Sequence, residues 1–214
     1  MKETKTNFLR LAIDSNVLQF GEFTLKSGRK SPYFFNAGLF NTGKAIAQLG
    51  RHYADTIVSS NIEFDMLFGP AYKGITLASA TASALSDKYD IDKPFAFNRK
   101  ESKAHGEGGC VVGANLKGKV LIIDDVITAG TAVREAYELI ISEGASVAGL
   151  VISMDRQERG KSKNSATNEL EQELNSPVMS IASLEDLIFF IKGDENLKSH
   201  LPNLIEYHSK YSSL

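Results

Sequence analysis

The segment VLIIDDVITAGT, residues 120–131, joins two acids to a run of small and hydroxyl residues. Asp124 and Asp125 end a β-branched run, and two ionised carboxylates can accept hydrogen bonds from two vicinal sugar hydroxyls. Residues 128–131 are small enough for the backbone to wrap around a phosphate, which the N–H groups of a following helix can bind. Paired aspartates also occur in phosphoacceptor and metal-binding domains, so the pair alone leaves both kinds of site open.

A cationic stretch, NRKESKAHGEGG, places Arg99, Lys100, Lys103 and His105 in one short, glycine-rich segment. A charge run in a loop is more often a solvated surface. The glycines shift the balance, because a lid over a leaving diphosphate must be mobile when open and must neutralise charge when closed. We therefore predict a mobile loop over residues 99–113.

The turn GPAYKGI follows an apolar run and places Lys73 just past the end of an expected strand. Many lysines in such turns are only exposed loop residues. Beside a phosphate site, however, this turn would present both Lys73 and several backbone N–H groups to the same diphosphate.

The stretch MDRQERG places Arg156 just beyond another expected strand, and a guanidinium can bind a carboxylate bidentately. Together with the adjacent Phe34 and Phe35, Arg156 could form a slot for a flat base that carries an acidic group. Phenylalanines are more often core residues than ligand contacts. The alternative for Arg156 is a surface arginine paired with Asp155 or Glu158.

Apolar periodicity and breaker residues predict the elements that carry these motifs. The expected strands are 66–68, 95–97, 119–124, 147–153 and 178–181, and the expected helices are 46–57, 75–85, 132–140, 184–191 and 197–211. The polar stretch 157–172 is expected only to link two elements. Strands that alternate with helices predict a doubly wound α/β core with a mostly parallel central sheet, in which ligands gather at the carboxyl ends of the strands.

The first 40 residues do not follow this alternation. Their aromatic, strand-like pieces are broken by glycine, proline and basic residues in EFTLKSGRKSPYFFNAG. We predict that residues 1–40 form a small cap beside an α/β core of residues 41–214, which includes the C-terminal helices.

Composition sets limits on partners and location. Lysine and arginine total 24 against 26 acidic residues, a net charge of −2, so we expect no nucleic-acid partner and no acidic membrane surface. The N-terminal MKETKTNFLR has no apolar run of signal-peptide length, and the single Cys110 cannot form an internal disulfide. These features predict a cytoplasmic protein.

Taken together, these motifs resemble the type I phosphoribosyltransferases, and the chain is similar from about Phe8 to its last helix to the bacterial orotate phosphoribosyltransferase family. The resemblance implies transfer of the 5-phosphoribosyl group from phosphoribosyl pyrophosphate (PRPP) to orotate. The products would be orotidine 5′-monophosphate (OMP) and pyrophosphate, in pyrimidine biosynthesis.

The resemblance also implies roles for individual residues. The residues expected to bind PRPP are Lys26, Tyr72, Lys73, Arg99, Lys100, Lys103, His105, Asp124, Asp125, Val126, Ile127, Thr128, Ala129, Gly130, Thr131 and Ala132. Those expected to bind orotate are Lys26, Phe34, Phe35, Thr128 and Arg156, the two phenylalanines largely through backbone groups. The expected catalytic residues are Lys103, His105, Asp124 and Asp125.

Three further expectations follow from the resemblance. Mg²⁺ would be held mainly by the diphosphate and ribose hydroxyls of PRPP, without direct protein ligands. The enzyme would be a homodimer with shared active sites, in which part of the 99–113 loop reaches the neighbouring subunit. The short GPAYKG turn, with the resemblance, predicts a cis peptide between Ala71 and Tyr72.

Three alternatives remain at this point. A purine phosphoribosyltransferase would share the PRPP segment, although Arg156 and the phenylalanine-rich cap argue against it. A non-catalytic PRPP-sensing regulator would be expected to carry a nucleic-acid-binding face, for which no basic surplus is evident. A phosphoacceptor receiver domain would have no use for the cationic segment 99–113.

Overall fold

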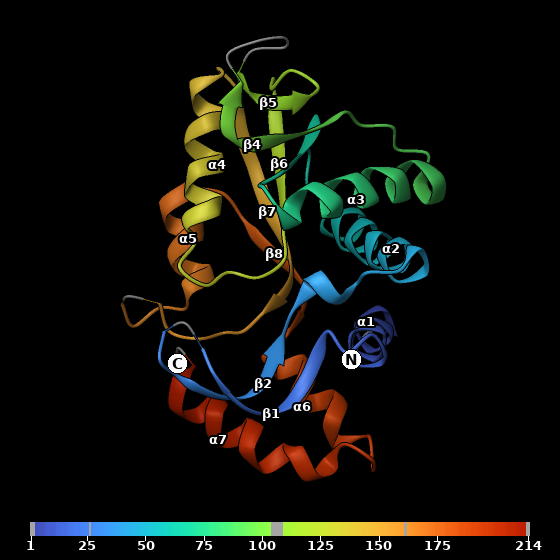
Figure 1. The fold of residues 1–214 in the computed structure, drawn as a ribbon, viewed down its shortest axis with the longest axis vertical. Helices are drawn as coiled ribbons and strands as arrows, with labels where there is room; N and C mark the ends of the chain where they lie inside the picture. Colours follow the sequence, from blue (N-terminus) through green and yellow to red (C-terminus); the bar gives the residue numbers. More distant parts are fainter. Residues whose placement is uncertain (1–2, 26, 104–108, 161, 213–214) are drawn as a thin grey trace.

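A six-stranded sheet forms the centre of the molecule in the computed structural model (Figure 1). The structure describes residues 3–25, 27–103, 109–160 and 162–212, and of residues 101–103 and 109 it describes the backbone only. The strands are β3 (Met66–Gly69), β4 (Phe95–Lys103), β5 (Gly109–Gly113), β6 (Lys119–Asp124), β7 (Ser146–Asp155) and β8 (Val178–Ser183). Their order is β5-β4-β3-β6-β7-β8, and only the β4–β5 pair is antiparallel.

Helices cover both faces of this sheet. Helices α2 (Gly43–Ser60) and α3 (Lys73–Tyr89) lie on one side, and α4 (Thr131–Ser142) and α5 (Ala166–Leu174) lie on the other (Figure 1). Strand β6 is apolar on both faces of the sheet, because Leu121 lies in one buried cluster and its neighbour Ile122 lies in the other. A layer of helices on each face is therefore needed to bury the strand. The predicted doubly wound, mostly parallel α/β core is confirmed.

Two local predictions were wrong. The segment 99–113 was expected to be a loop, yet β4 continues to Lys103 and pairs with β5 from Gly109, so that much of it is an antiparallel hairpin. The polar stretch 157–172 was expected to be a link, yet it contains most of α5. That helix buries only Thr167, Leu170 and Leu174, and so narrow an apolar stripe gives a weak helical signal.

The N-terminal and C-terminal elements lie at one end of the main sheet (Figure 1). They are α1 (Glu3–Asp14), β1 (Leu18–Thr24), β2 (Lys30–Phe35), a 3₁₀ turn at Ala37–Leu39, α6 (Leu184–Lys192), a 3₁₀ turn at Lys198–His200, and α7 (Leu201–Tyr211). Strands β1 and β2 form a separate antiparallel sheet. Phe8 of α1 and Leu187 of α6 share one buried cluster with Leu49 of α2. Because this cluster joins both parts of the chain, burial does not mark a boundary at residue 40, and the division there stays a prediction.

No helix within the described ranges combines the length and the apolar character that a membrane crossing requires. The predicted helices α2, α3, α4, α6 and α7 are all present. Strands β3, β4, β6 and β7 are parallel, so their carboxyl ends lie at one edge of the sheet. The chemical motifs of the sequence lie at this edge.

Candidate active site

Asp125, at the carboxyl end of β6, is the most firmly held acid of the site. Its side chain is buried, and its Oδ2 accepts a hydrogen bond from Lys73 Nζ at 2.6 Å. Its backbone carbonyl accepts from Ser153 N at 2.9 Å and from Ser153 Oγ at 2.6 Å, which ties it to β7. The structure thus brings together Asp125, which follows β6, and Lys73, which begins α3.

Asp124 is held beside it in a different way. Its Oδ1 accepts from Asp125 N at 2.9 Å, and its carbonyl accepts from Tyr53 OH at 2.7 Å. Burial, and next the charge of Asp125, raise the pKa of Asp124 from 3.8 to about 7. In the free protein Asp124 therefore exchanges a proton near neutral pH.

The raised pKa of Asp124 predicts how the folding stability of Asp124→Asn should change with pH relative to the wild-type protein. The folded pKa lies above the ordinary value, so the contribution of Asp124 to stability is largest at low pH and is lost as pH rises toward about 7. We expect the stability gained by Asp124→Asn to be larger at pH 8 than at pH 5, by about 2 to 3 kcal/mol. Urea denaturation of both proteins at the two pH values measures the difference. A gain independent of pH would contradict the prediction.

The segment from Val126 to Ala132 shapes an open helix start. Ile127 and Gly130 are buried, whereas Thr128 and Ala129 between them are exposed. Gly130 has φ 71°, a left-handed conformation that favours glycine. No side chain caps the start of α4, which leaves the first N–H groups of the helix, at Thr131 and Ala132, available to a phosphate.

The turn between β3 and α3 approaches the same edge. A Cβ at Gly69 would lie 2.0 Å from the Gly74 carbonyl oxygen, so glycine permits this close turn. Ala71 N donates to Asn98 Oδ1 of β4 at 2.8 Å, and the Ala71–Tyr72 peptide bond is cis, as predicted. The turn places Lys73 at the first position of α3.

Residues of β4 face this turn from the neighbouring strand. Lys100 Nζ lies 5.1 Å from the centroid of the Tyr72 ring, which is exposed. Arg99 is half-buried in β4, in a part of the strand where the pairing with β5 is irregular. Lys26 and His105 lie outside the described residues, and the side chain of Lys103 is not described.

Phe34 and Phe35 do not line one slot with their rings. Phe35 is 6% exposed and belongs to the core, whereas Phe34 is 37% exposed and stacks on Phe23 with 5.4 Å between ring centroids. Successive residues of a strand point to opposite faces. Only backbone groups of the pair could serve one base together.

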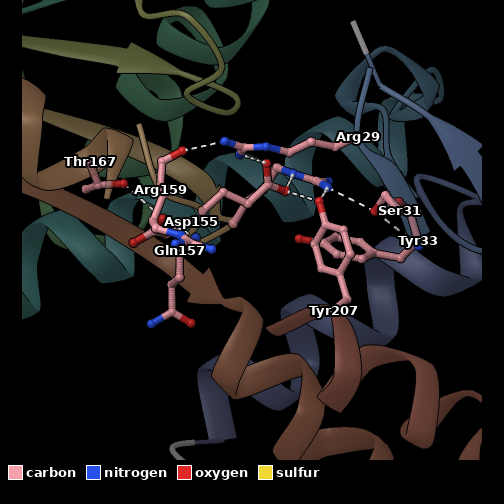
Figure 2. Close-up of polar contacts among 10 residues, drawn as sticks. Arg29, Ser31, Tyr33, Asp155, Gln157, Arg159, Thr167 and Tyr207 are labelled. Atoms are coloured by element: carbon pink, nitrogen blue, oxygen red, sulfur yellow. Dashed lines mark hydrogen bonds and ion pairs between the residues drawn. The ribbon is translucent and has the colours of Figure 1, made fainter. Parts of the chain in front are cut away.

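Arg156, just beyond β7, is buried in a polar network. Two of its partners, Ser31 and Tyr207, are labelled in Figure 2. Arg156 Nε donates to Glu158 Oε1 at 2.6 Å, and its Nη2 donates to Ser31 Oγ at 3.0 Å and to Tyr207 OH at 3.3 Å. Pairing with Glu158 was one of the alternatives for this arginine, but the side chain is not on the surface. Nη1 has no hydrogen-bond partner among the residues that the structure describes.

Comparisons with known proteins identify the family to which the chain belongs. The phosphoribosyl transferase domain model matches residues 38–178. The chain is 59% identical over 211 residues to the orotate phosphoribosyltransferase of Pseudomonas syringae pv. tomato, covering 99% of each chain. It is 55% identical over 211 residues to that of Shigella dysenteriae, again covering 99% of each. The chain belongs to the orotate phosphoribosyltransferase family.

A solved member of the family has the same fold. The crystal structure of the orotate phosphoribosyltransferase of Francisella tularensis superposes with a TM-score of 0.86 at 47% identity, covering 97% of this chain and 100% of that one. Family membership removes the receiver domain from the alternatives. It also agrees with the two acids at the end of β6 and the open helix start beside them.

Sequence reasoning missed several residues that build this site. Tyr53 and Ser153 hold the backbone of the two acids, and Asn98 fixes the turn after β3. Ser31 and Tyr207 surround Arg156. Ser31 and Tyr207 lie 125 and 51 residues from Arg156 in the sequence, so no local pattern could have joined them to it.

Proposed function

We propose that this protein transfers the 5-phosphoribosyl group from PRPP to orotate, giving OMP and pyrophosphate in pyrimidine biosynthesis. The observation that carries the proposal is the Asp124–Asp125 pair, which residues 126–130 join to the uncapped start of α4 and which is held to Lys73 through Asp125. Full-length identity of 59% to an orotate phosphoribosyltransferase supports the choice of base.

In the proposed reaction, a ring nitrogen of orotate forms a bond to C1 of the ribose while the C1–O bond to pyrophosphate breaks. The leaving pyrophosphate takes the electron pair of that bond and, directly or through water, the proton that the ring nitrogen loses, and the ribose gains oxocarbenium character in the transition state. No protein nucleophile is required, so the enzyme contributes alignment and charge stabilisation. Asp124 and Asp125 accept hydrogen bonds from the ribose hydroxyls, and the start of α4 binds the 5′-phosphate.

The cations of the site act on the leaving diphosphate. Lys73 and Lys100 approach it from the β3–α3 turn and from β4, and we assign Lys103 and His105 to the same charge stabilisation on the strength of the sequence. In the free protein Lys73 is paired with Asp125, so PRPP replaces this ion pair with contacts of its own.

Mg²⁺ is the proposed cofactor. No cluster of three or more histidine, cysteine or acidic residues suited to a metal occurs in the described part of the chain. The carboxylates of Asp124 and Asp125 are hard oxygen donors beside the ribose position, which fits an ion carried mainly by the diphosphate and ribose hydroxyls. When bound, the ion would neutralise charge on the diphosphate.

The base-binding part of the proposal assigns the orotate carboxylate to Arg156. Thr128, exposed beside the helix start, and the backbone of Phe34 and Phe35 would complete the contacts, with Lys26. The single cysteine, Cys110, is free and exposed, in keeping with the cytoplasmic location that we propose.

We also propose a homodimer whose sites are shared through the segment 99–113. Mixing inactive Lys103→Ala protein with inactive Asp125→Asn protein should then restore activity, because one site of each mixed dimer receives both intact residues. Recovery should approach about a quarter of wild-type activity per subunit. Each variant alone is the control. No recovery, once subunit exchange has been demonstrated by tagged pull-down, would show that each subunit supplies its own lysine.

The direct test of the activity follows the loss of orotate absorbance in the presence of PRPP. We expect the loss of absorbance to require protein, PRPP and Mg²⁺. It should not occur when EDTA is added before the protein. A folded protein that consumes no orotate under these conditions would disprove the proposed function.

A further inference from the structure

The polar network around Arg156 joins three regions that are far apart in the sequence. Its members come from β2, from the segment after β7 and from the C-terminal helix α7 (Figure 2). We propose that Tyr207 of α7, acting with Glu158, positions Arg156 for the acidic group of the base, so that the C-terminal helix is part of the base-binding slot. This inference rests on the proposed function.

The contacts of Arg156 fix the plane of its guanidinium. Glu158 holds Nε, and Ser31 and Tyr207 together use both hydrogens of Nη2. The ring of Tyr33 lies against the guanidinium, with Cζ 4.3 Å from its centroid. The two hydrogens of Nη1 therefore remain for a carboxylate, in a direction that the other contacts set.

Tyr207 and Glu158 hold each other as well as the arginine. Tyr207 OH donates to Glu158 Oε1 at 2.6 Å while accepting from Arg156, and Glu158 Oε2 accepts from Arg29 Nη1 at 3.0 Å. Burial, and next the bond to Glu158, raise the pKa of Tyr207 to about 12. The phenol therefore keeps its proton at neutral pH and can bridge the two charged groups.

Further contacts tie α7 to the segment that carries Arg156. Arg159 N donates to the carbonyl of Tyr211 at 2.9 Å, and Arg159 Nη2 donates to the carbonyl of Lys210. Glu158 forms an isolated β-bridge with Ser212. The end of α7 is thus held in register with Arg156, which is what a helix that positions a ligand group requires.

Without the Tyr207 hydroxyl, Glu158 loses one of the three groups that orient it, and Arg156 loses one partner of Nη2. Glu158 could then turn to form a two-bond pair with the guanidinium, which would compete with a ligand carboxylate. The expected consequence is weaker binding of orotate, with PRPP unaffected because its proposed contacts lie on other loops.

The test uses Tyr207→Phe, which removes only the hydroxyl. We expect the KM for orotate to rise about tenfold, as for the loss of a hydrogen bond to a charged group, with the KM for PRPP and the melting temperature nearly unchanged. The matched control is Tyr211→Phe, the same change on the same helix, at a hydroxyl without a hydrogen-bond partner in the described structure. This control should leave both KM values at wild-type levels.

A double-mutant comparison separates positioning from a general structural role. If Tyr207 acts through Arg156, Tyr207→Phe should have no further effect on orotate binding in the Arg156→Ala protein. Equal losses for orotate and PRPP, or a full further loss in the Arg156→Ala protein, would overturn the inference.

The outcomes also separate this inference from the proposed function. A wild-type protein without orotate transfer would overturn both. Wild-type activity with unchanged orotate kinetics in Arg156→Ala would overturn the role of Arg156 and, with it, that of Tyr207. A strong effect of Arg156→Ala with none of Tyr207→Phe would overturn the inference alone.

Discussion

Asp125→Asn is expected to lower kcat/KM for PRPP by about 100-fold or more while leaving the fold intact. The carboxylate is buried, holds Lys73 at 2.6 Å and accepts a ribose hydroxyl in the proposed complex. Asparagine has the same shape, but it lacks the negative charge and turns a donor toward either the lysine or the sugar. The loss should therefore fall on catalysis rather than on folding.

Steady-state kinetics with PRPP as the varied substrate measure this effect, and circular dichroism checks the fold. Asp186→Asn is the matched control, because Asp186 also pairs with a lysine at 2.6 Å but caps helix α6, away from the site. Turnover and PRPP affinity near wild-type values in Asp125→Asn would remove Asp125 from the ribose site.

Arg156→Ala is expected to lower kcat/KM for orotate by a factor that corresponds to about 2 to 5 kcal/mol of transition-state stabilisation. A charge-assisted contact to a carboxylate is lost in a buried position, whereas the diphosphate contacts of PRPP lie elsewhere. Arg156→Lys should give a smaller loss, since an ammonium keeps the charge but cannot reproduce the guanidinium geometry. kcat/KM for orotate and the KM for PRPP, measured for each variant, decide the matter.

Arg10→Ala serves as a control, because Arg10 is paired with Asp194 at 2.7 Å and neither residue makes a hydrogen bond in the Arg156 network. It should leave orotate kinetics unchanged. If Arg156→Ala retains the wild-type specificity for orotate, the arginine has only a structural role. Lys26 would then be the next candidate for the carboxylate.

The fold was largely predictable because its strands are buried on both faces. In β6 the run from Val120 to Ile123 is apolar throughout, which identifies a central parallel strand, and the glycine turn after it identifies the start of α4. The antiparallel β4–β5 hairpin was not predicted, because the charges and glycines between Arg99 and Gly109 mask both the second half of β4 and the start of the edge strand β5.

The candidate site was predictable where it is local in sequence. The acids of β6 and the turn at Lys73 each carry their signal within a few residues. The environment of Arg156 was not predictable, because Tyr207 reaches it from a helix 51 residues away. Its burial is likewise a property of packing between β2, β7 and α7, which periodicity does not specify.

The most direct test of the account is a competition among bases in one reaction. The protein is incubated with PRPP, Mg²⁺ and equal concentrations of orotate, uracil, hypoxanthine and adenine, and the nucleotides are separated by chromatography. We predict that OMP is by far the main product, and that it is nearly absent when Asp125→Asn protein is used. Faster formation of a purine nucleotide or of UMP, or no nucleotide at all from folded wild-type protein, would contradict it.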